Sequence, residues 1–243
     1  MVSVLQLQRR KISRFLLVLG LVLVCLTGCK TSDEEPETYD LIAELKDSIR
    51  NNKTELEFKT PVMWTDFSEA YIQVYQFEPM TIGLAKDVSI KRDDQDNEFV
   101  EMVRFNYTIP MEEMIQQKNE VEIACSYIID GINKCNSDQE KVDLIIKNLI
   151  SDFEYDDLQE DSNSIYSALC KKQANCQGIS KAFFLLCNRT GIKVGYCIGK
   201  LDGYPHMWNY VFINDQKTQV DVLGKALDID EKNRVLDNYV EYE

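Results

Sequence analysis

The sequence predicts an α+β fold in which a helix packs against an antiparallel sheet. Apolar residues recur at helical spacing after residue 137, and a second apolar helix begins near residue 176. Two pairs of strand-like segments are each joined by a polar turn, one at residues 91–97 and the other at residues 214–215. The second turn is Asn-Asp, and both residues tolerate the positive φ of a two-residue hairpin, so antiparallel pairing follows.

The composition is that of a globular protein with an acidic surface. Of the 243 residues, 44% are hydrophobic and 28% are charged. The formal net charge is −14, and residues 1–28 hold four positive charges and no negative ones, so without them the charge falls by four to −18. An exterior this acidic argues against binding nucleic acid or anionic lipid headgroups through charge. We therefore expect no nucleic-acid partner.

Residues 1–28 have the pattern of a lipoprotein signal peptide. A basic stretch precedes an apolar run from Phe15 to Leu26, which is short for a membrane-spanning helix. The run ends in Leu-Thr-Gly-Cys at residues 26–29, which resembles the bacterial lipobox and implies that Cys29 carries lipid, including palmitate. Residues 29–38 would then be a flexible acidic tether, and the protein would be lipid-anchored on the extracytoplasmic side of a bacterial membrane. An unprocessed membrane anchor is the alternative.

Residues 39–110 are predicted to form an N-terminal α/β region, either a separate small module or elements packed onto the core. Helices are expected where apolar residues recur at helical spacing, and strands where apolar and polar residues alternate. The helices are Tyr39–Ile49 and Asp66–Phe77, and the strands are Thr54–Phe58, Asp87–Ile90 and Phe99–Thr108. We expect the last two strands to pair.

Residues 111–243 are predicted to form the main domain. A helix is expected from Glu112 to about Ile132, and a second begins at a capping box of Ser137 and Glu140. The apolar stripe of this second helix is typical of core packing. Residues 153–163 form an acidic loop that is either solvated or lines a substrate cleft.

Six cysteines follow residue 29, and we expect most of them to be small buried hydrophobes. No two are spaced as Cys-x-x-Cys and the chain has a single histidine, so a zinc site is not expected. The acidic run at residues 93–96 lacks the glycine and distal glutamate of a calcium loop. We expect no metal and no other cofactor.

Cys176 has the setting of an activated nucleophile. It lies in the first turn of an apolar helix, with Asn175 as a candidate cap. Free N–H groups and the positive end of a helix stabilise a thiolate and can hold the oxyanion of a tetrahedral intermediate. Gly178 removes a side chain near the thiol, which favours substrate approach. Taken alone, Cys176 could equally be one more buried cysteine.

His206 is the only histidine in the chain, so no other histidine can serve as a base. If the hairpin closes on its two-residue turn, Asp221 in the second strand faces Trp208 and lies diagonal to His206. The carboxylate could then bind one imidazole nitrogen while the other faces Cys176. These residues predict a nucleophile, its base and a group that orients the base.

Three motifs together resemble the core of the transglutaminase-like superfamily. They are Asn-Cys-Gln-Gly-Ile-Ser-Lys-Ala-Phe at 175–183, Pro-His-Met-Trp-Asn-Tyr-Val at 205–211 and Gln-Val-Asp-Val at 219–222. The resemblance implies a papain-like architecture, with the nucleophile helix on an antiparallel sheet that carries the histidine and the aspartate. It implies a catalytic triad of Cys176, His206 and Asp221, and Gln177, Gly178 and Trp208 become candidates for substrate binding or the oxyanion site. Calcium dependence is not expected.

The resemblance also implies acyl transfer through a thioester at Cys176. Water as acceptor would make the protein a peptidase or amidase, which we favour, and an amine would make it a crosslinking transferase. The substrate would be a peptide, a protein or a cell-wall peptide, and we expect a monomer. The alternative is a catalytically silent binding or scaffolding lipoprotein of the cell envelope.

Overall fold

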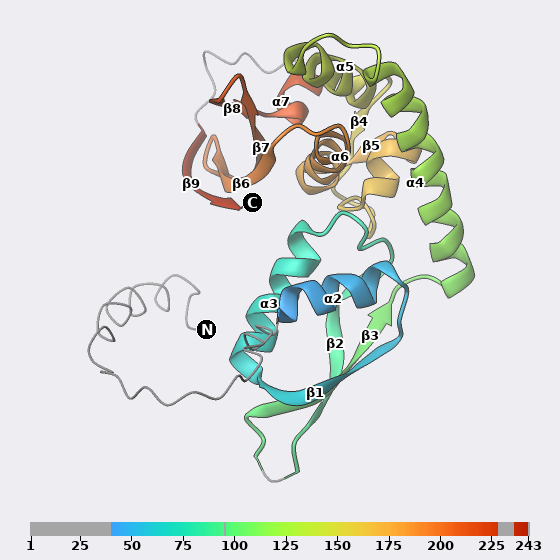
Figure 1. Ribbon diagram of the computed structural model, residues 1–243, viewed down its shortest axis with the longest axis vertical. Helices are drawn as coiled ribbons and strands as arrows, with labels where there is room; N and C mark the ends of the chain where they lie inside the picture. The colour runs from blue at the N-terminus through green and yellow to red at the C-terminus, as the bar shows by residue number, and fades with distance from the viewer. Residues whose placement is uncertain (1–39, 95, 228–235, 243) are drawn as a thin grey trace, which may run out of the picture. The chain divides into compact units, whose positions relative to one another are not determined.

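The computed structural model describes residues 40–94, 96–227 and 236–242 (Figure 1). The predicted signal peptide at 1–28, the lipid attachment site at Cys29 and the tether at 29–38 lie outside these residues. The described residues belong to one compact unit of helices and sheets, which confirms the predicted α+β class. Within these ranges, no helix combines the length and the apolarity needed to cross a bilayer.

The N-terminal region is a three-stranded antiparallel sheet that shares its core with two helices (Figure 1). Its elements are α2 (Leu41–Arg50), β1 (Glu55–Met63), α3 (Trp64–Phe77), β2 (Leu84–Arg92) and β3 (Phe99–Tyr107), with strand order β1-β3-β2. Both helices and all three strands contribute to one apolar cluster, which includes Leu45, Phe67 and Val103. The two predicted helices and the predicted pairing around residues 91–97 are confirmed.

Strand β1 is longer than the sequence pattern predicts. The alternation ends at Phe58, whereas the strand continues to Met63. Pro61 has no N–H to donate to a neighbouring strand. The chain accommodates it with an irregularity in register between Glu57 and Val62, after which pairing with β3 resumes. Because apolar and polar residues no longer alternate after this irregularity, the sequence pattern does not reveal the second half of the strand.

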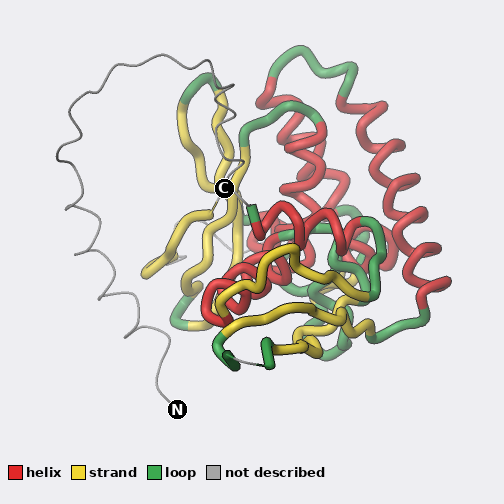
Figure 2. The backbone as a smooth tube through the Cα atoms, turned by 60° about the horizontal axis from the view of Figure 1, so that its bottom comes forward, coloured by secondary structure: helices red, strands yellow, loops and turns green. Residues whose placement is uncertain are grey.

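In the main domain, α6 lies between other helices and a four-stranded antiparallel sheet (Figure 2). The helical elements are α4 (Met111–Ile132), α5 (Asp138–Ile150), a π-helix η1 (Ser167–Lys171), α6 (Cys176–Arg189) and α7 (Val222–Ala226). The sheet has the order β8-β7-β6-β9, from β6 (Val194–Leu201), β7 (Tyr204–Ile213), β8 (Gln216–Val220) and β9 (Leu236–Tyr242). A short parallel pair, β4 (Glu154–Tyr155) and β5 (Gln173–Ala174), precedes α6. The main apolar cluster includes Phe183 of α6, Ile145 of α5 and Val211 of β7.

The predicted capping box at the start of α5 forms with one difference. The Glu140 N–H donates to Ser137 Oγ at 3.2 Å, as expected. The Glu140 carboxylate accepts from the N–H of Asn136 at 2.6 Å, not from that of Ser137. The N–H that donates to the Glu140 carboxylate therefore belongs to the residue before the N-cap and not to the N-cap itself.

The β7–β8 hairpin has the predicted register but a shorter second strand. Asn214 and Asp215 have φ angles of 51° and 61°, and the strands pair from Ile213 with Gln216 onward. The prediction that Asp221 lies in this strand is wrong, because β8 ends one residue earlier and Asp221 is the N-cap of α7. An aspartate is a favoured N-cap, since its carboxylate accepts an N–H that has no partner within the helix.

Candidate active site

Cys176 begins α6 with its thiol half-buried. Asn175 is the cap, and its Oδ1 accepts the N–H of Gln177 at 3.0 Å and that of Gly178 at 3.1 Å. The first N–H groups of a helix have no acceptor within the helix. Because the cap takes those of Gln177 and Gly178, the N–H of Cys176 is the donor best placed for an oxyanion.

Gly178 is required by the backbone around it. A Cβ built on this residue would lie 2.6 Å from the carbonyl oxygen of Ser162 and 2.9 Å from that of Ser164. Both distances are shorter than carbon–oxygen contacts allow, and both neighbours are backbone. The glycine therefore lets the loop before the nucleophile pack against α6, whereas the sequence suggested that it opens space for the substrate.

His206 and Asp221 form a buried pair. The imidazole Nε2 lies 2.8 Å from Oδ2 of Asp221, and the two residues are 6% and 3% exposed. The other carboxylate oxygen, Oδ1, accepts the N–H of Gly224 at 3.0 Å. The cap of α7 thus fixes the carboxylate that binds the imidazole, so the predicted contact forms from a helix start instead of a strand.

Asp221 binds only one imidazole nitrogen of His206, and Cys176 is close enough to the imidazole to be among the groups that raise its pKa. Burial disfavours the charged imidazole, but hydrogen bonds and charge from Asp221 and Cys176 outweigh it and raise the pKa of His206 to about 9. The imidazole is therefore protonated at neutral pH, which puts a cation beside the sulfur.

Trp208 supports the imidazole from within the core. Its side chain is fully buried, its indole N–H donates to Oε1 of Gln219 at 3.2 Å, and its ring stacks on that of His206 with centroids 5.7 Å apart. The structure therefore places Trp208 in contact with the base and away from solvent.

Asn209 is a structural residue that the sequence reasoning did not single out. Its buried amide donates to the carbonyl oxygens of Ser180 at 3.3 Å and Gly195 at 3.2 Å. In addition, Ser180 Oγ donates to the carbonyl of Met207 at 3.1 Å. These bonds tie α6 to the strand that carries His206, and so fix Cys176 relative to His206.

The C-terminal end of α3 also holds α6, the helix that Cys176 begins. Its last three carbonyl oxygens accept hydrogen bonds from side chains of the main domain. Lys181 Nζ donates to Tyr75 at 3.0 Å, Gln177 Nε2 to Gln76 at 3.2 Å, and Tyr196 Oη to Phe77 at 2.9 Å. A helix leaves its last carbonyls without intrahelical partners, and here two residues of α6 and one of β6 supply them. The Gln177 amide is thus committed to α3. Sequence reasoning missed this role of Lys181, although a lysine within the apolar stretch of α6 was a signal.

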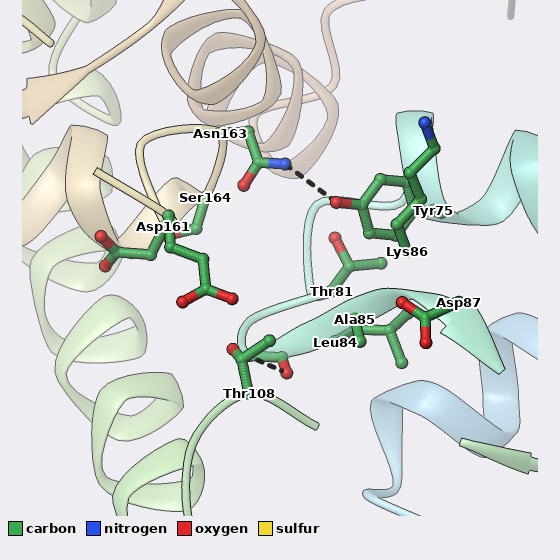
Figure 3. A pocket seen from close by; sticks show the side chains of 12 residues that line it. Tyr75, Thr81, Leu84, Ala85, Lys86, Asp87, Thr108, Asp161, Asn163 and Ser164 are labelled. Carbon is green, nitrogen blue, oxygen red and sulfur yellow. Dashed lines mark hydrogen bonds between the residues drawn. The ribbon is translucent and has the colours of Figure 1, made fainter. Parts of the chain in front are cut away.

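A polar cavity of about 230 Å³ lies beside the loop that abuts Gly178 (Figure 3). Its walls include Tyr75 and Asn163, which are joined by a hydrogen bond of 3.2 Å. Gly178 and Cys176 are two helix positions apart, a rotation of about 200°, so this loop and the thiol lie on different faces of α6. No residue of the Cys-His-Asp group lines this cavity, and we do not assign it to the reaction.

The other described cysteines differ in how far they are buried. Cys125, Cys187 and Cys197 are buried, as the sequence predicts, while Cys135 and Cys170 are partly exposed, and all are unpaired. Burial raises the pKa of Cys125 and of Cys170 to about 11 and that of Cys197 to about 12. Among the residues whose placement is described, no group of acidic, histidine or cysteine side chains is arranged to hold a metal ion.

Comparison with known proteins identifies the domain that carries this site. The family model of the transglutaminase-like superfamily matches residues 127–221, a span that contains Cys176, His206 and Asp221. No curated protein matches the chain.

Solved structures with similarity to the chain include a TGase, with 14% identity, a TM-score of 0.42, and coverage of 76% of this chain and 53% of that one. A candidate protease from Parabacteroides distasonis has 11% identity and a TM-score of 0.33, with 56% of this chain and 36% of that one covered. A candidate cysteine protease from Cytophaga hutchinsonii has 12% identity and a TM-score of 0.38, with 66% and 74% covered. The chain thus spans about half the length of the TGase and about a third of the first protease. By the family match, residues 127–221 form a domain of the transglutaminase-like superfamily.

Proposed function

We propose that this protein is a thiol enzyme that attacks amide or peptide bonds and forms an acyl-enzyme at Cys176. One observation carries the proposal: the buried His206–Asp221 pair lies close enough to the half-buried Cys176 for this cysteine to act on the pKa of the imidazole. Burying a carboxylate and an imidazole is costly, and a module that only binds has no need to direct both of them at a cysteine.

In the proposed reaction, the proton of the Cys176 thiol resides on the free nitrogen of His206, and the sulfur attacks the carbonyl carbon. The carbon–sulfur bond forms as the π electrons of the carbonyl move onto its oxygen, which the Cys176 N–H stabilises. Collapse of the tetrahedral intermediate breaks the carbon–nitrogen bond, and the imidazolium gives its proton to the departing amine. The products are a free amine and a thioester at Cys176.

A second nucleophile then releases the acyl group. Water gives hydrolysis, and an amine gives a crosslinked product. We place hydrolysis first, because water reaches a half-buried thiol without a second binding site. The substrate would be a peptide, a protein or a cell-wall peptide. The lipobox-like residues 26–29 support a lipid anchor on Cys29, which would hold the enzyme outside the cytoplasmic membrane.

Alkylation of each cysteine as a function of pH tests the proposal on the purified full-length chain. We expect iodoacetamide to modify Cys176 at lower pH than Cys135, which is also partly exposed but has no imidazole partner among its described contacts. His206→Ala should remove the difference. Peptide mass spectrometry reads each site separately.

Two outcomes would contradict the proposed enzyme activity. If Cys176 in a folded protein reacts like Cys135, or if His206→Ala leaves its pH profile unchanged, the thiol is not activated. The silent binding lipoprotein would then be the better description. Mixing a thioester-forming substrate peptide with and without an added primary amine separates hydrolase from transferase, because only a transferase gives the amine conjugate.

A further inference from the structure

We propose that Tyr155 forms one wall of the acyl-binding site and selects substrates with a flat apolar group next to the attacked carbonyl. This inference rests on the proposed function, because it concerns the same thiol. It assigns a role to a residue in the acidic loop that precedes the nucleophile.

Strand pairing fixes Tyr155 beside the start of α6. Tyr155 of β4 is in register with Ala174 of β5, two residues before Cys176, and the following N–H of Asp156 donates to the Ala174 carbonyl at 3.1 Å. The preceding pair is joined through side chains, since Gln173 Nε2 donates to Glu154 at 2.9 Å. The phenol is close enough to the thiol that, after burial and Asp157, Cys176 is among the groups that raise the pKa of Tyr155.

The ring of Tyr155 is held at its polar end and open along its length. Its hydroxyl donates to Oδ2 of Asp157 at 3.2 Å, while 45% of the residue remains exposed. The Asp157 carboxylate therefore contacts the hydroxyl, and the face of the Tyr155 ring remains available to another group. Leu158 in the same loop is 92% exposed, but no strand pairing fixes it, so exposure alone does not distinguish Tyr155.

The sheet side of the thiol is apolar as well. Cys176 packs against a cluster of Phe77, Tyr196 and Met207, with Tyr242 partly buried beside it. An acyl group on the sulfur would therefore have a hydrocarbon surface on one side and the Tyr155 ring on the other. Stacking on an aromatic ring strengthens binding by about two- to tenfold beyond area burial, and this favours a planar apolar group over a small or charged one.

Two neutral alkylating reagents with the same electrophile test this inference without a known substrate. We would compare chloroacetamide with N-benzyl chloroacetamide on the full-length chain, with Cys135 as the internal reference for intrinsic reactivity. At each cysteine we would measure the alkylation rate with the benzyl reagent divided by the rate with chloroacetamide. We expect this ratio to be several-fold to tenfold higher at Cys176 than at Cys135. Tyr155→Ala should remove this preference, and Tyr155→Phe, which keeps the ring, should retain most of it. Leu158→Ala is the matched control and should change nothing.

The outcomes separate this inference from the proposed function. An activated Cys176 with equal preference at both cysteines, or a preference that survives Tyr155→Ala, would overturn the aromatic wall and leave the enzyme intact. A cationic reagent, N-(2-aminoethyl) chloroacetamide, that outcompetes the benzyl reagent in a Tyr155-dependent way would also overturn it, since the loop would then select charge. If Cys176 shows no activation, the proposed function itself fails. Tyr155→Phe keeps the test usable if Tyr155→Ala does not fold.

Discussion

Lys181 gives a quantitative prediction about how α6 is held against α3. The residue is 2% exposed, and its amine donates to the Tyr75 carbonyl and to Thr81 Oγ1, both at 3.0 Å. The carboxylate that acts on it, Glu78, is also buried and already accepts two hydrogen bonds from Arg50, at 3.1 and 2.8 Å. Burial therefore lowers the pKa of Lys181 to about 7, and Glu78 offsets only part of that effect.

The size and sign of the pH dependence of stability follow from the difference in the pKa of Lys181 between the folded and unfolded states. In the unfolded chain the lysine has its ordinary value of 10.5, so folding shifts the pKa by about 3.5 units. At about 1.36 kcal/mol per unit this corresponds to roughly 5 kcal/mol. Between pH 7 and 10.5 the unfolded state binds more protons at this site than the folded state. Stability therefore rises with pH across that window, by up to about 1.4 kcal/mol per unit, and is flat on either side.

Lys181→Met tests this with urea unfolding from pH 6 to 10.5. The difference in unfolding free energy between wild type and variant should rise with pH over the window, because other titrating groups cancel in the difference. Lys118→Met is the matched control: burial lowers the pKa of Lys118 to about 8, so its slope should begin about one unit higher. Parallel curves for wild type and Lys181→Met would refute the view that a buried amine ties α3 to α6.

Three further variants test the site. Gly178→Ala should destabilise the fold by about 1–3 kcal/mol in thermal or urea unfolding, because its Cβ would meet the backbone carbonyls of Ser162 and Ser164, and a neutral result would contradict the close approach. Asn175→Ala should cost about 1 kcal/mol through loss of the α6 cap, measurable in the same unfolding assay. Asp221→Asn should lower the pKa of His206 from about 9, since burial would then prevail over the remaining partner. The single histidine makes this a one-signal NMR titration, and an unchanged midpoint would refute the assignment. In wild type the raised value adds stability below pH 6.5 that is lost as pH rises through 9, and the variant should lack it.

The sequence predicts much of the placement of Cys176, His206 and Asp221, because the local signals around these residues are strong. Asn214 and Asp215 set the hairpin register, and Asn175 marks the start of α6. The error at Asp221 has a specific cause. The predicted contact with His206 requires the strand to extend to Asp221, whereas the chain leaves the sheet one residue earlier and uses the same carboxylate as a helix cap. An N-cap aspartate and a strand aspartate look alike in sequence, because the short helix that follows has only five residues.

The structural roles of Gly178 and Gln177 could not be predicted from the sequence, because the groups that they contact are distant along the chain. Gly178 faces a loop whose path depends on the turn at residues 159–164, and no local pattern encodes that approach. The Gln177 amide donates to a carbonyl 101 positions away in the chain. Spacing rules describe neighbours within a helix or a hairpin, and a contact made by tertiary packing leaves no periodic trace.

The end of α3 shows that residues outside the family match take part in holding the site. The match covers residues 127–221, whereas the carbonyls that Gln177, Lys181 and Tyr196 bind belong to Tyr75, Gln76 and Phe77. A helix end buried without partners would cost about 1–3 kcal/mol for each unsatisfied carbonyl. The side chains that satisfy α3 lie on α6 and on β6, next to the strand of His206. Removing α3 would therefore take the acceptors from Gln177 and Tyr196 and leave Lys181 with Thr81 alone, on the elements that carry Cys176 and border the strand of His206. The N-terminal region is for this reason part of what positions Cys176, and a chain trimmed to the family match should lose thiol activation together with stability.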